Sequence, residues 1–122
     1  AVEPNTNSIF VKSGQTIIRQ GERDCTAYII ESGQVEVFVT DSDGDAVLAT
    51  LGTGDLIGEQ SALFLHPRTA SVRAVSDCVL LIVDSEELKR KFDASPASTR
   101  AVLKILSARI ARINSIAVAR KI

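Results

Sequence analysis

Residues 27–51 read AYIIESGQVEVFVTDSDGDAVLATL, three apolar runs separated by a glycine-containing turn and then by an acidic one. In the middle run Val35 and Val37 flank Glu36, and this period of two is typical of a strand with two different faces. Asp43-Gly44, between the second and third runs, is typical of a hairpin turn. The stretch therefore predicts antiparallel strands joined by tight turns.

The same pattern continues on both sides of this stretch. All seven glycines lie before residue 59. Turn signals recur at roughly 8–12-residue spacing, which is typical of a small β sandwich or barrel. The predicted strands are Ser8–Lys12, Thr16–Gln20, Ala27–Glu31, Val35–Thr40, Ala46–Leu51, Ser71–Val75 and Val79–Val83.

The pattern changes to helical after the last strand. Asp84 or Ser85 can cap a helix that continues through Phe92. Pro96 suits the first position of a second, longer helix. At 122 residues and 13.1 kDa the chain has room for one domain, so residues 1–122 are predicted to form one mainly β domain with C-terminal helices.

The second helix carries an apolar stripe. Its members are Leu103, Leu106, Ile110, Ile113 and Ala117, and a second apolar flank comprises Val102, Ile105, Ile116 and Val118. The stripe is about two heptads long, shorter than a convincing coiled coil. It predicts either a helix packed on the β body or the seam of a homodimer, and two apolar flanks leave room for both.

Charge is unevenly distributed along the chain. Residues 1–93 hold all fifteen acidic and eight basic side chains, whereas residues 94–122 hold six basic side chains and no acidic one. A basic helix can bind nucleic acid or anionic lipid. A solvated helix face, or one packed on the acidic body, is the simpler interpretation and the one we favour.

Neither a membrane-length apolar run nor a secretory leader is found in the sequence, so we expect a cytoplasmic protein. The chain begins at Ala1, which fits a processed protein or a fragment. Two cysteines and one histidine are too few for a four-thiolate metal site or a His-rich centre.

The residue spacings in this sequence do not match those of known metal-binding and nucleotide-cofactor motifs. The acidic turn that begins at Asp41 has Ala46 and Gly52 where a calcium loop needs glycine and glutamate. The glycines at 52, 54 and 58 are one residue too widely spaced for a dinucleotide fingerprint. The sequence therefore predicts no enzyme, no metal and no cofactor.

One segment between two predicted strands carries binding chemistry. Gly58 precedes one or two helical turns over Glu59–Leu63, and the start of a helix favours anions. Arg68 offers a guanidinium fork, which suits phosphate, whereas an ionised Glu59 accepts hydrogen bonds from hydroxyls. The simpler alternative is a structural ion pair between Arg68 and Glu59.

From Phe10 onward the chain resembles the cyclic nucleotide-binding domain family, the type found in catabolite activator protein and in protein kinase regulatory subunits. The opening FVKSGQTIIRQGERDCTAYIIESGQVEV resembles the start of the family domain, and GEQSALFLHPRTASVRA at 58–74 resembles its phosphate-binding cassette. The resemblance covers about residues 10–115.

This resemblance implies an eight-stranded antiparallel β roll, jelly-roll-like, over about residues 8–84. It also implies a short cassette helix and two C-terminal helices at about 85–93 and 96–120. Arg68 would bind the cyclic phosphate, and Glu59 would accept the ribose 2′-OH. The implied ligand-binding residues are Gly58, Glu59, Gln60, Ser61, Arg68, Thr69 and Ala70. The implied base pocket comprises Val47 and Leu51, with Arg112, Asn114 or Ser115 as a polar cap.

The chain departs from the family pattern at two cassette positions. Gln60 stands where an apolar residue is usual. Thr69 stands where many cAMP-selective kinase domains have alanine, and in eukaryotic relatives threonine there accompanies cGMP. Bacterial cAMP binders also carry serine or threonine there, so cAMP is favoured over cGMP.

The expected function is a regulatory module that binds cAMP, or as second choice cGMP, and relays binding through its C-terminal helices to an attached or partner effector. We expect the effector, and any direct DNA-binding domain, to lie outside this chain. The alternative is a β-roll scaffold that binds no nucleotide and dimerises through Leu103, Leu106, Ile110 and Ile113. Which effector is regulated does not follow from the sequence.

Overall fold

The computed structural model describes residues 7–106 and 108–109. Its elements are β1 (Ser8–Val11), β2 (Thr16–Ile18), β3 (Ala27–Ser32), β4 (Val35–Asp41), β5 (Gly44–Leu51), β6 (Leu56–Ile57), α1 (Glu59–Phe64), β7 (Ser71–Ala74), β8 (Cys78–Val83) and α2 (Ser85–Ala94). A further helix covers 97–106 and 108–109. This order confirms the prediction of strands first and helices last.

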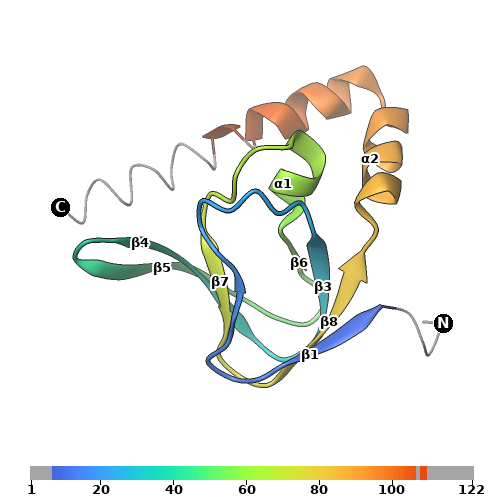
Figure 1. The fold of residues 1–122 in the computed structure, drawn as a ribbon. Helices are drawn as coiled ribbons and strands as arrows, with labels where there is room; N and C mark the ends of the chain where they lie inside the picture. The colour runs from blue at the N-terminus through green and yellow to red at the C-terminus, as the bar shows by residue number, and fades with distance from the viewer. Residues whose placement is uncertain (1–6, 107, 110–122) are drawn as a thin grey trace.

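The strands form two four-stranded antiparallel sheets (Figure 1). One has the order β1-β8-β3-β6 and the other β2-β7-β4-β5. The first strand therefore pairs with the last, and β2 pairs with β7, although these partners lie far apart in the sequence. The arrangement confirms the eight-stranded antiparallel β roll.

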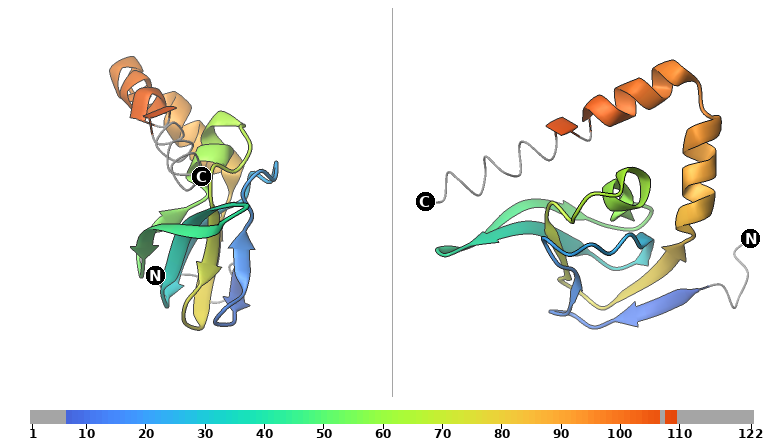
Figure 2. Two further views of the ribbon diagram at one scale, coloured as in Figure 1. Left: turned by 90° about the vertical axis from the view of Figure 1, so that its left-hand side faces the viewer. Right: turned by 45° about the horizontal axis from the view of Figure 1, so that its top comes forward.

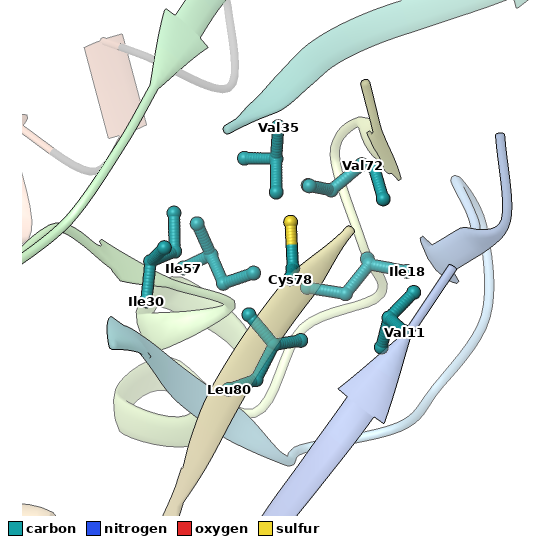
Figure 3. Packing of buried hydrophobic residues seen from close by; sticks show 9 residues of the cluster. Val11, Ile18, Ile30, Val35, Ile57, Val72, Cys78 and Leu80 are labelled. Atoms are coloured by element: carbon teal, nitrogen blue, oxygen red, sulfur yellow. The ribbon is translucent and has the colours of Figure 1, made fainter. Parts of the chain in front are cut away.

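The core lies between the two sheets and is almost entirely aliphatic (Figure 3). Its buried cluster comprises Val11, Ile18, Ile30, Val35, Ile57, Val72, Ala74, Cys78 and Leu80. Ile30, Val35 and Leu80 are fully buried, and each contributes on the order of 2 kcal/mol by leaving water. Cys78 is a free thiol that packs as a small apolar side chain.

Two details of the strands differ from the prediction. β6 was not predicted, because a strand of two residues, Leu56–Ile57, is too short to show a period. The hairpin turn lies one residue earlier than expected, since Asp41 pairs with Gly44 and only Ser42 and Asp43 lie between them.

The helix α2 begins as predicted. The side chain of its N-cap, Asp84, accepts a hydrogen bond of 2.9 Å from the backbone N–H of Glu86. At the other end the Arg100 guanidinium donates to the carbonyl oxygens of Asp93 and Ser95, which fixes the bend into the next helix. None of the helices in the described part of the chain is long and apolar enough to span a membrane.

The C-terminal helices lie on the same side of the strands as α1 (Figure 2). Of the predicted second helix, the structure describes 97–106 and 108–109, and these residues are helical. Ile110, Ile113 and Ala117 of its apolar stripe lie outside the described residues. Leu103 and Leu106, the two described members, are 40% and 46% exposed.

Candidate functional site

A cavity of about 470 Å³ lies between the β2-β7-β4-β5 sheet and α1. Its lining residues are Ile18, Val37, Leu48, Ala49, Leu51, Leu56, Ile57, Gly58, Glu59, Gln60, Ser61, Arg68, Thr69, Ala70 and Val72. All seven residues of the implied ligand-binding set line this one cavity. Its size and its apolar wall with a few polar groups at one end are typical of small-molecule sites.

Gly58 shapes the entrance to α1. Its φ is +78°, a left-handed conformation that glycine adopts without strain. A Cβ at this position would lie 2.7 Å from Arg68 Nη1 and 2.7 Å from the carbonyl oxygen of Thr26. The absence of a side chain at Gly58 therefore lets the guanidinium pass close to the backbone.

Arg68 is held at the wall of the cavity and is only 5% exposed. Its Nη1 donates to the carbonyl oxygen of Gly58 at 3.0 Å, and its Nη2 donates to that of Thr26 at 2.6 Å. Nη2 also lies 3.8 Å from Asp24 Oδ1. Nε is buried and has no hydrogen-bond partner among the described residues, and each Nη carries a second N–H that these two bonds do not use.

Asp24 is a site residue that sequence reasoning missed. Its Oδ1 accepts hydrogen bonds from the backbone N–H of Thr26 at 2.9 Å and from Thr26 Oγ1 at 2.8 Å. These two bonds, together with the nearby Arg68 charge, hold the pKa of Asp24 below its usual range. The Asp-x-Thr spacing is a local turn signal, but nothing in it indicates that Arg68 lies next to it. The alternative of an Arg68–Glu59 ion pair is replaced by this pair with Asp24.

Glu59 begins α1 and is half-buried. Burial raises the pKa of its carboxyl, while its own backbone N–H and the Arg68 charge oppose the shift. When ionised, this carboxylate can only accept hydrogen bonds, and Glu59 lines the same cavity as Arg68. The cavity therefore has an acceptor and a cation at its polar end.

The apolar wall differs from the prediction at one position. Leu51 lines the cavity, but Val47 is 53% exposed and is not among the lining residues. A register shift between Val37 and Phe38 leaves Leu48 unpaired, so that Val37 faces Ala49 across the ladder. Leu48 and Ala49 line the cavity in place of Val47.

The three other predicted base contacts, Arg112, Asn114 and Ser115, lie outside the described residues. A polar cap over the base therefore stays a prediction. In the described part of the chain, no group of three or more His, Cys, Asp or Glu side chains is placed to hold a metal ion.

An aromatic contact joins the cassette to the C-terminal helices. Phe64, the last residue of α1, meets Phe92 of α2 edge-to-face at a centroid distance of 5.4 Å. Phe64 also stacks with His66 at 6.4 Å. This contact packs the end of α1 against α2.

Comparison with known proteins gives a consistent set of relatives. The sequence model of the family described as "Cyclic nucleotide-binding domain" matches residues 8–95. The "cAMP-dependent protein kinase regulatory subunit" of Eremothecium gossypii is 36% identical over 81 residues, which cover 66% of this chain and 17% of that protein. The "CRP-like cAMP-activated global transcriptional regulator" of Mycobacterium tuberculosis is 29% identical over 123 residues, covering 93% of this chain and 55% of that protein.

Solved structures agree with these relatives. The cAMP-bound form of the EAL enzyme Bd1971 has a TM-score of 0.86 and 29% identity, covering 91% of this chain and 30% of that chain. The cGMP-bound form of the same enzyme has a TM-score of 0.83. The chain spans 17% and 55% of the length of the two curated relatives named above.

Proposed function

The chain belongs to the cyclic nucleotide-binding domain family, and we propose that it binds cAMP in the cavity at Arg68 and relays this binding to an attached or partner effector. The observation that carries the proposal is Arg68 itself. It is a buried guanidinium on the wall of a small-molecule cavity, oriented by backbone carbonyls and left with an unpartnered Nε. A buried, unpartnered donor is unfavourable unless a ligand or water satisfies it.

The polar end of the cavity suits a cyclic phosphate and a ribose. Arg68 would donate to the phosphate oxygens in charge-assisted hydrogen bonds. The first residues of α1, Glu59, Gln60 and Ser61, line the cavity, and the first backbone N–H groups of a helix have no partner within it. Glu59 would accept the ribose 2′-OH, and Leu51 and Ala49 offer an apolar wall for the base.

The preference for cAMP is supported by the relatives rather than by a contact to the base. Both curated relatives named above carry cAMP in their names, whereas the Bd1971 enzyme is known in complex with cAMP and with cGMP. Thr69 lines the cavity and is a residue that bacterial cAMP binders also use at this position. Titrating the domain with both nucleotides in parallel measures the preference directly, and tighter binding of cGMP would reverse this assignment.

The relay is supported by the Phe64–Phe92 contact. A ligand that draws α1 toward the phosphate would shift Phe64, and α2 would move with it. The Arg100 bonds at the end of α2 would carry the movement into the next helix. Such a switch requires that the ligand bind one helix arrangement more tightly than the other.

The role of Glu59 is tested with a ligand that lacks the ribose hydroxyl. Calorimetric titration of the wild-type domain and of Glu59→Ala with cAMP and 2′-deoxy-cAMP forms a two-by-two cycle. We expect Glu59→Ala to weaken cAMP binding about tenfold or more and to leave 2′-deoxy-cAMP binding nearly unchanged, since a hydrogen bond to a charged group contributes about 1.5–3 kcal/mol. If Glu59→Ala lost the same affinity for both ligands, Glu59 would not be the acceptor of the ribose 2′-OH.

A dimerisation scaffold remains the second candidate, and one observation favours it. Val102, Leu103, Ile105 and Leu106 are 54%, 40%, 52% and 46% exposed, which is high for large apolar side chains on one helix. Light scattering with and without cAMP separates the candidates. A dimer whose melting temperature is unchanged by every cyclic nucleotide would favour the scaffold.

A further inference from the structure

Asp24 places a fixed negative charge beside the phosphate-binding arginine. Its carboxylate is held by two hydrogen bonds from Thr26, at 2.9 and 2.8 Å, and lies 3.8 Å from Arg68 Nη2. The Asp24 side chain is 54% exposed, whereas that of Arg68 is 3% exposed. The guanidinium thus lies between a solvent-facing carboxylate and the cavity.

The site is less cationic than a single buried arginine suggests. Among the described residues that line the cavity, Arg68 and Glu59 are the charged ones, with opposite signs. Asp24 adds a second negative charge at contact distance from the guanidinium. The formal charge of Arg68, Glu59 and Asp24 together is therefore −1, and a phosphate in the cavity would interact through space with Asp24 although Asp24 does not line the cavity.

We propose that Asp24 sets the charge of the phosphate that this site accepts, disfavouring doubly charged phosphomonoesters more than singly charged cyclic phosphodiesters. The inference rests on the proposed function, because it assumes that a phosphate binds at Arg68. A 5′-phosphomonoester is close to doubly charged at pH 7.5, since its second pKa is about 6. A cyclic phosphodiester has no second ionisation and stays singly charged.

Coulomb energy is linear in the ligand's charge, and this gives the proposal a quantitative signature. If neutralising Asp24 tightens binding of a monoanion by some factor, it should tighten binding of a dianion by about the square of that factor. For a half-exposed carboxylate one guanidinium away from the phosphate, we expect a factor of roughly two to five for the monoanion. A purely steric or packing effect would not follow the ligand's charge.

The hydrogen bonds that orient Arg68 go to backbone carbonyl oxygens and not to the Asp24 carboxylate. The carbonyl oxygens of Gly58 and Thr26 hold the guanidinium at 3.0 and 2.6 Å, much closer than Asp24 does. Asp24→Asn also keeps an oxygen that can accept the two bonds from Thr26. The substitution therefore removes charge and leaves the framework of the site in place.

The experiment measures displacement of a fluorescent cAMP analogue by cAMP and by 5′-AMP at pH 7.5, in 20 and 500 mM NaCl. Asp24→Asn is compared with wild type and with Glu22→Gln, which makes the same charge change in the same loop but removes a partner of Arg19. Asp24→Ser is a second charge-removing variant that retains a hydroxyl acceptor for Thr26. Melting temperatures without ligand show that each variant is folded.

At low salt we expect Asp24→Asn and Asp24→Ser to bind cAMP two- to five-fold more tightly than wild type, and 5′-AMP with roughly the square of that gain. Both gains should shrink in 500 mM NaCl, because exposed charges are screened there. Glu22→Gln should change either affinity much less. Unchanged or weaker cAMP binding in both Asp24 variants would overturn the proposal, and so would a gain for 5′-AMP no larger than that for cAMP. Wild-type protein that fails to bind the cAMP analogue would instead overturn the proposed function.

Discussion

Burial of Glu59 makes the stability of the ligand-free domain depend on pH. Burial raises the pKa of this carboxyl above 4.5, so between pH 4.5 and the raised pKa the native state binds more protons than the unfolded state. The free energy of unfolding should therefore fall as the pH rises through that window. Glu59→Gln should remove the fall and be more stable than wild type at pH 7. Urea titrations from pH 4 to 8 measure this, and identical pH profiles for the two proteins would contradict it.

Gln60 has a buried amide oxygen without a hydrogen-bond partner, at a cassette position where an apolar residue is usual. An unsatisfied buried acceptor costs about 1–3 kcal/mol. We expect Gln60→Leu to raise the free energy of unfolding by about 1 kcal/mol. The matched control is Gln20→Leu, because Gln20 Oε1 accepts the backbone N–H of Thr40 at 2.9 Å. That control should destabilise the domain, and a destabilised Gln60→Leu would show that its amide oxygen is satisfied in solution.

At the scale of residues, the sequence predicted the residues of the cassette but not Asp24, which lies next to Arg68. Gly58, Glu59 and Arg68 belong to one short segment whose chemistry is visible locally, and they line one cavity. Asp24 lies 44 positions before Arg68, and only the packing of the loop before β3 brings the two together. No local pattern contains that contact, which is why the sequence suggested Glu59 as the partner of Arg68.

The junction between β6 and α1 depends on Gly58 for two separate reasons, and a matched pair of variants separates them. Gly58→Ala adds backbone strain at φ +78° and clashes with Arg68 Nη1 and with the backbone carbonyl oxygen of Thr26. Gly14→Ala adds the same kind of strain at φ +89°, with no atom within 4 Å of the new Cβ. We expect Gly14→Ala to cost about 1–2 kcal/mol.

Gly58→Ala should cost more than Gly14→Ala, and it should also weaken cAMP binding because Arg68 must move. Chemical denaturation gives the first comparison and calorimetry the second. Equal destabilisation by the two substitutions would contradict this account, because it would mean that Arg68 and the Thr26 backbone accommodate the added Cβ at no cost.

The contact between α1 and α2 predicts how binding is transmitted. Phe92→Ala removes the edge-to-face partner of Phe64, a pair worth about 0.5–1.5 kcal/mol beyond the area that it buries. In the wild type, cAMP should change the hydrogen-exchange protection of α2. In Phe92→Ala the ligand should still bind, but the change in α2 should be reduced. Leu88→Ala on the same helix is the control, and an undiminished response in Phe92→Ala would place the relay elsewhere.

Element boundaries followed the sequence where a period or a cap was present. Alternation predicted β4, and the Asp84 cap predicted the start of α2. The two-residue β6 is too short to show a period, and no residue pattern in the sequence indicates the register shift beside Leu48. This bulge decides which residues of β5 face the cavity, so Val47 was predicted in place of Leu48 and Ala49.

For the whole molecule, the positions of glycines, turn signals and helix caps predicted the division into strands and helices but not the pairing of the strands. The first and last strands, β1 and β8, are neighbours in one sheet, and this closure comes from tertiary packing. The β roll was predicted because the chain resembles a known family. That resemblance implies a strand order, which residue periodicity alone does not. Burial of Arg68 between loop and cassette is likewise a property of the closed roll.

Ligand-dependent melting of the whole domain, with and without the Arg68 guanidinium, is the most direct test of nucleotide binding at this site. Wild type, Arg68→Lys and Arg68→Ala are melted alone and with cAMP, cGMP or 5′-AMP. Arg68→Lys keeps the charge without the fork, and the readout is the shift caused by ligand, so a lower baseline in either variant does not affect it. At about 100 times the dissociation constant, cAMP adds roughly 2.7 kcal/mol of stability.

That amount corresponds to several degrees for a domain of this size. We predict such a rise for wild type with cAMP, a smaller one with cGMP, almost none with 5′-AMP, and little or none for either Arg68 variant with any ligand. A wild-type domain whose melting temperature ignores both cyclic nucleotides, or an Arg68→Ala variant that responds as fully as wild type, would contradict nucleotide binding at Arg68.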